Sequence, residues 1–167
     1  MTIKSNTPPE EKDEAQTPPY LFNYAKARWT PDIDLAASHE NHKCSKYFTY
    51  EDNSLIQDWA RSGSSGWCNP PYSNIPPWLL KAAEHRDKFR TILLIPTPNG
   101  EAMYKIVEEY ASELILIHGR ISFVRPNGQK MTGNTRGSCF VVFDWERGSN
   151  QTCKLSWLDR NILEENY

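Results

Sequence analysis

The sequence has no long apolar run, and this absence predicts that no helix crosses a membrane, because such a helix needs roughly 20 apolar residues. The cysteines, at positions 44, 68, 139 and 153, form no CxxC pair and no framework spacing. Together with the lack of a signal peptide, this pattern favours reduced thiols in a soluble, cytoplasmic protein.

A strongly basic composition is missing too. The formal net charge is −2 at pH 7, so no overall positive field indicates a nucleic-acid partner, and any such contact must come from a local patch. A zinc site could be imagined from His39, His42, Cys44 and Cys68. Their spacing fits no standard zinc finger, so we interpret them as packing and surface residues and expect no metal.

With 167 residues and no internal repeats, the chain has the length of one domain with a substantial core. Residues 1–16 are polar and lack an apolar period, which predicts a disordered tail. We expect a single folded domain over residues 17–167. It begins with a helix capped by Thr17, with proline in the first turn.

The middle of the chain alternates strand and helix patterns. We expect strands at 32–38, 47–49, 67–68, 91–95 and 114–117, and helices opening at Glu51, over 75–88 and over 101–112. The continuous apolar runs 91–95 and 114–117 are typical of strands buried on both faces. This order predicts an α/β protein with a doubly wound, mostly parallel sheet.

The last third changes character. Residues 121–124 and 138–143 are strand candidates, joined by a polar, basic loop over residues 125–137. A loop of this length within a compact domain is usually functional or disordered. Residues 144–167 are weakly patterned and suggest a turn and a short terminal helix, without a functional interpretation.

The most informative stretch is residues 67–73, Trp-Cys-Asn-Pro-Pro-Tyr-Ser. Pro70 and Pro71 fix the backbone and remove two donors, which predicts a stiff, extended loop. The Asn69 amide oxygen and the Pro70 carbonyl are acceptors beside the flat ring of Tyr72, which suits a planar amine. Two accepted N–H bonds would localise the nitrogen lone pair for in-line attack on an electrophilic methyl group. A proline-rich turn with Tyr72 as a packing aromatic is the other interpretation.

The tetrapeptide looks like the amino-methyltransferase signature (Asp/Asn/Ser)-Pro-Pro-(Tyr/Phe), and further segments accompany it. These are Thr17-Pro18, Asp34-Leu-Ala-Ala-Ser, Tyr47-Phe-Thr, Asp52-Asn-Ser-Leu, Lys81-Ala and Gly119-Arg-Ile-Ser-Phe. Over about residues 17–143 the chain resembles the bacteriophage-type DNA N6-adenine methyltransferases, the Dam-like enzymes of phages and prophages. The resemblance implies a Rossmann-like, S-adenosylmethionine-dependent methyltransferase fold. Its mostly parallel sheet of about seven strands would end in a C-terminal antiparallel hairpin.

The resemblance also implies contacts to S-adenosylmethionine. The candidate residues are Thr17, Pro18, Asp34, Ala36, Asp52, Asn53 and Asn69. Thr17 and Pro18 would lie near the methionine moiety, Asp34 would contact its amino group or the ribose, and Asp52 or Asn53 would bind the adenine. The small residues after Asp34 stand where many related enzymes have a Phe-x-Gly-x-Gly turn, so this turn must differ in backbone conformation.

For the substrate, the resemblance implies double-stranded DNA, from which the target adenine is flipped out. The catalytic residues would be Asn69, Pro70, Pro71 and Tyr72. Candidate DNA and base contacts are Tyr72, Ser73, Arg120, Phe123, Arg125, Lys130 and Arg136. Phe123 fits a pocket wall or a core residue of the hairpin equally well, and the basic residues fit phosphate contacts or a solvated loop.

Other acceptors stay open, because the same signature occurs in methyltransferases of RNA bases and of protein glutamine. A catalytically silent DNA-binding module of the same fold is a further alternative. We expect a monomer without membrane association, located in the cytoplasm, or in the host cytoplasm if the chain is phage-encoded. The target DNA sequence is not readable from these residues.

Overall fold

The structure is a computed structural model that describes residues 15–131, 136–146 and 151–167. Most of the predicted tail, residues 1–14, and residues 132–135 of the basic loop lie outside the described residues. In chain order the elements are α2 (Pro19–Trp29), β1 (Ile33–Asp34), β2 (Lys46–Tyr47), the 3-10 turn η1 (Ser54–Ile56), α3 (Trp59–Ser62), β3 (Ser65–Cys68), α4 (Pro76–His85), β4 (Arg90–Pro96), α5 (Glu101–Tyr110), β5 (Glu113–His118), β6 (Ser138–Phe143), β7 (Lys154–Asp159) and α6 (Arg160–Asn166).

The strands form one seven-stranded sheet in the order β2-β1-β3-β4-β6-β5-β7. Four neighbouring pairs are parallel: β1 with β2, β1 with β3, β3 with β4, and β5 with β7. β6 is antiparallel to both of its neighbours, β4 and β5. The predicted α/β class and the number of strands are confirmed, and the sheet is mixed.

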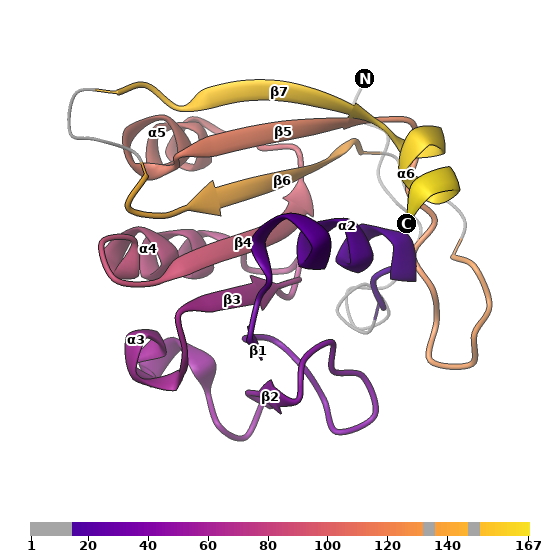
Figure 1. Ribbon diagram of the computed structural model, residues 1–167, viewed down its shortest axis with the longest axis horizontal. Helices are drawn as coiled ribbons and strands as arrows, with labels where there is room; N and C mark the ends of the chain where they lie inside the picture. The colour runs from indigo at the N-terminus through magenta and orange to yellow at the C-terminus, as the bar shows by residue number, and fades with distance from the viewer. Residues whose placement is uncertain (1–14, 132–135, 147–150) are drawn as a thin grey trace.

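Helices cover both faces of this sheet, α2 and α6 on one side and α3, α4 and α5 on the other (Figure 1). On the central strand β4, Ile92 and Leu94 pack with α2, whereas Leu93 and Ile95 pack on the α4 side. Successive side chains of a strand point to opposite faces, so a strand covered on both sides must be apolar throughout. Among the described residues, no helix is both long and apolar enough to cross a membrane.

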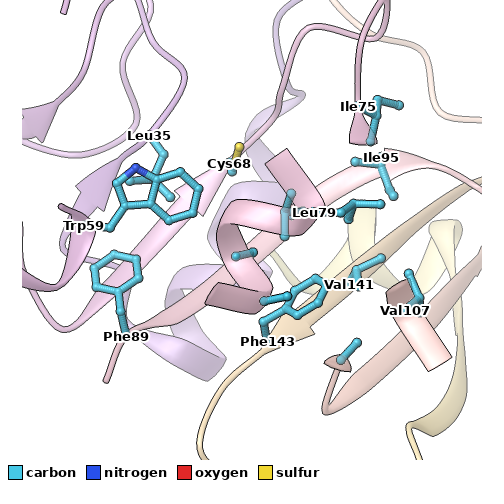
Figure 2. Packing of buried hydrophobic residues seen from close by; sticks show 14 of the residues in the cluster. Leu35, Trp59, Cys68, Ile75, Leu79, Phe89, Ile95, Val107, Val141 and Phe143 are labelled. Atoms are coloured by element: carbon cyan, nitrogen blue, oxygen red, sulfur yellow. The ribbon is translucent and has the colours of Figure 1, made fainter. Parts of the chain in front are cut away.

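The core on the α4 side anchors the strand that leads to the candidate catalytic loop. Figure 2 shows Leu79 of α4 and Val107 of α5 in one cluster with Val141 of β6 and Cys68 of β3. Burying a side chain of the size of leucine or valine contributes roughly 1.5–3 kcal/mol. Cys68 belongs to this cluster, and therefore β3 is fixed immediately before Asn69.

The predicted hairpin between residues 121–124 and residues 138–143 is wrong. Val124 forms isolated bridges with Gln16 and Lys130, while β6 pairs with β4 and β5. Gly119, with φ of +94°, turns the chain out of β5 before this segment. Alternating apolar residues record which side chains are buried but not which strand supplies the hydrogen bonds, and here the partners lie outside the sheet.

Other details also differ from the prediction. The weakly patterned C-terminal region contains β7 before the expected terminal helix, α6. The first helix has Pro18 as its N-cap instead of Thr17, and begins at Pro19. The helix expected from Glu51 consists of η1 and the short α3. β5 buries only alternate side chains, because its side chains on the α5 face lie next to the exposed edge strand β7.

Candidate active site

The candidate catalytic loop, residues 69–73, starts where β3 leaves the sheet. β3 is buried along its length and lies between β1 and β4, with Trp67 beside Asp34. The loop therefore leaves from the carboxyl ends of parallel strands, where open α/β sheets bind their ligands. The Asn74 N–H donates to the Pro71 carbonyl at 3.3 Å and closes a turn that does not use the Pro70 carbonyl.

Asn69 has a fixed side-chain orientation. Its Nδ2 donates to the Ala15 backbone carbonyl at 3.2 Å. The other end of the amide, Oδ1, is buried and has no hydrogen-bond partner among the described residues. Leaving a buried acceptor without a donor costs about 1–3 kcal/mol. Such a group in a native structure needs an explanation, and a donor that arrives with a ligand supplies one.

Tyr72 lies against Phe123 in an edge-to-face contact. Their ring centroids are 5.7 Å apart and the ring planes are at 90°. The Tyr72 hydroxyl is buried without a partner in the described part of the chain, and this burial raises the pKa of Tyr72 well above its ordinary value. Phe123 is only 5% exposed and belongs to the core on the α2 side. Phe123 is thus part of this core, although not of a hairpin, and it braces the ring of Tyr72; its role as a wall of a base pocket stays a prediction.

The N-terminal segment contacts Asn69 directly and Tyr72 through its neighbour Phe123. Ala15 binds Asn69, and the next residue, Gln16, exchanges two backbone hydrogen bonds of 2.8 and 3.0 Å with Val124. Val124 in turn follows the residue that touches Tyr72. The last two residues assigned to the tail are therefore held by the fold. No sequence pattern indicates the contribution of Ala15, because it comes from a backbone carbonyl within a polar segment.

Asp34, the last residue of β1, is 3% exposed. Its carboxylate accepts the Lys43 N–H at 2.9 Å and the Ala36 N–H at 3.2 Å, so it holds the loop between β1 and β2 in place. Burial raises the pKa of Asp34 to about 6, although both N–H bonds favour the charged form. Carboxyl groups that titrate this close to neutrality cluster at functional sites.

The candidates that follow β2 lie at the same edge of the sheet. Asp52 and Asn53 are exposed. The Asp52 carboxylate accepts from the Thr49 N–H at 2.8 Å and from the Thr49 hydroxyl at 2.9 Å, and these bonds lower the pKa of Asp52. Asn53 has a left-handed backbone with φ of +49°. Candidate residues thus follow three neighbouring parallel strands. Thr17 and Pro18, both buried, continue the segment that binds Asn69.

The predicted DNA contacts occupy the catalytic loop and the connection from β5 to β6. Exposed residues among them are Ser73, Arg120, Arg125, Lys130 and Arg136. The first half of the basic loop is folded, since the Arg125 N–H donates to the Gln129 carbonyl at 2.8 Å. At its other end, the Gly137 carbonyl accepts the Thr97 N–H at 2.9 Å, which ties this connection to the loop after β4.

The histidines after β1 are engaged with an aromatic ring. His42 stacks on Tyr47 with centroids 4.3 Å apart, and the His39 Nδ1 lies 3.1 Å from the Tyr47 hydroxyl. In the parts of the chain that the structure describes, no group of three or more His, Cys, Asp or Glu side chains is arranged to hold a metal ion.

The seven-stranded mixed sheet, with an Asn-Pro-Pro-Tyr loop after a buried parallel strand, is consistent with the class of methyltransferase-like α/β proteins. Comparison with known proteins gives the family. A family model described as DNA N-6-adenine-methyltransferase (Dam) matches residues 4–166. This chain therefore belongs to the DNA N-6-adenine-methyltransferase family.

Individual relatives agree with the family. A DNA N-6-adenine-methyltransferase of Haemophilus phage HP1 is 30% identical over 171 residues, covering 99% of this chain and 97% of the relative. An enzyme of the same name from Escherichia phage T1 is 30% identical over 166 residues, covering 88% of this chain and 69% of the relative. The putative methyltransferase YfdM of Escherichia coli K12 is 35% identical over 74 residues, which are 41% of this chain and 77% of YfdM.

Proposed function

We propose that this protein transfers a methyl group from S-adenosylmethionine to N6 of adenine in double-stranded DNA. Membership of the family supports the reaction and the acceptor atom, and the names of the two phage relatives agree with both. The observation that carries the proposal is Asn69 Oδ1, a buried acceptor without a donor among the described residues, close to an aromatic pair.

The adenine amino group is the donor that this site lacks. One N6 N–H would bond to Asn69 Oδ1 and the other to the Pro70 carbonyl, which the local turn leaves unused. Both bonds draw the nitrogen lone pair out of the ring and aim it at the methyl group. The Ala15 carbonyl has the supporting role, because its bond to Nδ2 keeps Oδ1 directed toward the substrate.

Tyr72 contributes its ring. Its pKa is raised well above the ordinary value, so the hydroxyl is neutral at physiological pH and unsuited to act as a base. A base that has left the duplex loses its stacking, and the face of an aromatic side chain recovers part of that loss. The edge-to-face contact with Phe123 holds the ring of Tyr72 in place for this purpose.

The residues at the strand ends fit the cofactor. S-adenosylmethionine supplies the electrophilic methyl group of a sulfonium. The Asp34 carboxylate suits its ammonium group or ribose, and Asp52, whose pKa is lowered, stays ionised and can accept from the adenine amine or a hydroxyl. Thr17 and Pro18 lie next in the chain to the segment that binds Asn69, and this supports a methionine moiety bound near the acceptor. This arrangement supports a Rossmann-like binding mode across these strand ends.

Exposed cations supply the local attraction for DNA that the net charge of −2 does not. Arg120, Arg125, Lys130 and Arg136 all lie in the connection that carries Phe123 and is tied to the loop after β4. Phosphate contacts from this connection would bring a flipped base to Tyr72. A membrane has no part in this proposal, and the cytoplasm that contains the DNA is the expected location.

The test is direct detection of the product. Purified protein is incubated with adenine-containing duplex DNA and S-adenosylmethionine, the DNA is digested to nucleosides, and N6-methyladenine is measured by mass spectrometry. Parallel reactions with RNA and with a glutamine-containing peptide test the alternative acceptors. We expect N6-methyladenine from DNA alone. Transfer to RNA or peptide in its place, or cofactor and DNA binding without transfer to any acceptor, would contradict the proposal.

A further inference from the structure

The edge strand β7 is poorly protected against pairing with another chain. The opposite edge of the sheet, β2, is only two residues long and carries the exposed Lys46. β7 is six residues long, and its Leu155 and Trp157 are 55% and 67% exposed. Natural sheets usually avoid a long edge with exposed apolar side chains, because it is a template for another strand. This strand is outermost in the sheet (Figure 1).

Leu155 and Trp157 belong to one apolar strip. They pair in register with Leu114 and Leu116 of β5, which are only partly buried on the α5 side. Paired residues of neighbouring strands present their side chains on the same face of a sheet. The four side chains therefore continue the apolar face of the sheet to its edge. Contiguous exposed apolar surface of this kind marks interaction sites.

We propose that β7 forms the interface of a homodimer, in which the two β7 strands pair antiparallel about a twofold axis at Ser156. The Lys154 N–H donates inward to the Ser112 carbonyl at 2.9 Å. Alternation along the strand then directs the backbone N–H and C=O groups of Leu155 and Trp157 outward, away from β5. These are the groups that a second strand needs.

The axis at Ser156 makes the strand complementary to itself. It places Leu155 opposite Trp157 of the second copy, and symmetry repeats this pair. Residues paired through outward-directed backbone groups exchange both hydrogen bonds. Apolar side chains directly opposite each other on one face add cross-strand packing. On the other face, Lys154 lies opposite Leu158 of the second copy, and its methylene stem can cover Leu158 while its ammonium lies 3.9 Å from the Glu113 carboxylate.

The neighbouring registers are less favourable. With the axis at Trp157, Leu155 would face Asp159 of the second copy, and Lys154 would have no strand residue opposite it, because α6 begins at Arg160. An apolar side chain opposite a carboxylate gains no packing. An axis at Leu155 would leave the last residues of β7 without a strand residue opposite them.

The favourable register, with its axis at Ser156, indicates a second copy of this chain as the partner. In an isologous interface the same patch is used twice, so every favourable pair occurs twice. One strand on each side makes a small interface, so we expect dissociation constants on the order of micromolar. The proposal replaces the expectation of a monomer.

A cysteine on the axis tests the register. In the dimer, the two copies of residue 156 form a non-hydrogen-bonded pair with Cα atoms about 4.5 Å apart, within the range of a disulfide. We expect Ser156→Cys to give a covalent dimer under mild oxidation. The matched control is Ala102→Cys, exposed on α5, and the unmodified protein controls for the native cysteines. A cross-link no stronger than in these controls refutes the register.

Sedimentation equilibrium over a wide concentration range tests the dimer itself. We expect Trp157→Arg to weaken dimerisation on the order of a hundredfold, because each dimer loses the pair twice. Leu80→Arg is the control, since Leu80 is 54% exposed but lies on α4, and it should leave the dimer unchanged. A native protein that is monomeric at every concentration, or a dimer that survives Trp157→Arg, overturns the proposal. Neither readout depends on methyl transfer.

Discussion

The two halves of the sheet differ in how they treat buried polar groups. In the parallel half, β2-β1-β3-β4, the strand ends carry a carboxyl whose pKa is raised to about 6, at Asp34, and an amide oxygen without a donor in the described residues, at Asn69. In the other half, β6 is buried throughout, and Asp144 just beyond its end pairs with Arg90 at 2.9 Å. We infer that the unsatisfied amide oxygen of Asn69 serves the function, whereas the ion pair of Arg90 with Asp144 serves the stability of the fold.

The largest effect should come from Asn69→Ala, which removes an acceptor without filling the site. We expect the rate of methyl transfer in a single turnover to fall about a thousandfold, as when one preorganised hydrogen bond to the reacting centre is lost. Cofactor affinity, measured by calorimetry, should change by no more than a few fold. The control is Asn74→Ala in the same loop, whose turn hydrogen bond comes from the backbone. Retained transfer in Asn69→Ala would refute the assigned role.

The opposite result is expected in the antiparallel half. Phe140 is fully buried and packs with Tyr24 and Trp67, with centroids 5.5 and 6.3 Å away. Phe140→Ala should lower the free energy of unfolding by about 3–5 kcal/mol, measured with denaturant. The transfer rate per folded molecule should stay unchanged. Leu80→Ala, at a side chain more than half exposed on α4, should cost less than about 1 kcal/mol. A rate that falls with stability would remove the distinction between the halves.

The two halves of the sheet also differ in how well the sequence predicted them. The parallel half was predicted well because its local signals agree with its tertiary role: the continuous apolar run 91–95 is buried on both faces, and two prolines mark the loop after β3. Asp34 and Asn69 could be placed at one edge because strands in parallel order end together. In this half of the sheet, the local sequence pattern is compatible with a single arrangement of the strands.

The antiparallel half was predicted less well for a physical reason. β7, Lys-Leu-Ser-Trp-Leu-Asp, is an exposed edge, so burial does not impose an alternating pattern on it. Residues 121–124 alternate like a strand, but their backbone bonds go to Gln16 and to the basic loop. The role of the Ala15 carbonyl could not be predicted from the sequence for a related reason. Every residue has the same main-chain acceptor, and only the fold determines which one lies next to Asn69.

A middle-sized effect should follow from the pKa of Asp34. Its ionised form would bind the cofactor ammonium group, and with a pKa of about 6 most of the carboxyl is ionised at pH 7 and most is protonated at pH 5. We expect the affinity for S-adenosylmethionine to fall about tenfold between these values. Calorimetry at several pH values measures this, and an affinity that is flat across the range would contradict the assigned contact.

The stability of the protein without cofactor should respond to pH in the opposite direction. Because the folded pKa is raised from 3.8 to about 6, the folded state holds the proton more tightly. This contribution, up to about 3 kcal/mol, is fully present below pH 3.8 and is lost as the pH rises through 6. Asp34→Asn is the control, because it has no charge to titrate, and the part of each slope that comes from this carboxyl should disappear in it.

The smallest effect should come from Tyr72→Phe, which separates the ring from its hydroxyl. The hydroxyl is buried and has no partner in the described residues, so its removal relieves a desolvation penalty, and we expect stability to rise by about 1 kcal/mol. The ring keeps its contact with Phe123, 5.7 Å between centroids, so transfer should stay within about twofold. Tyr72→Ala removes the stacking face and should lose most activity. If Tyr72→Phe lost activity as severely, the hydroxyl and not the ring would be the functional group, and the loop would need a different mechanism.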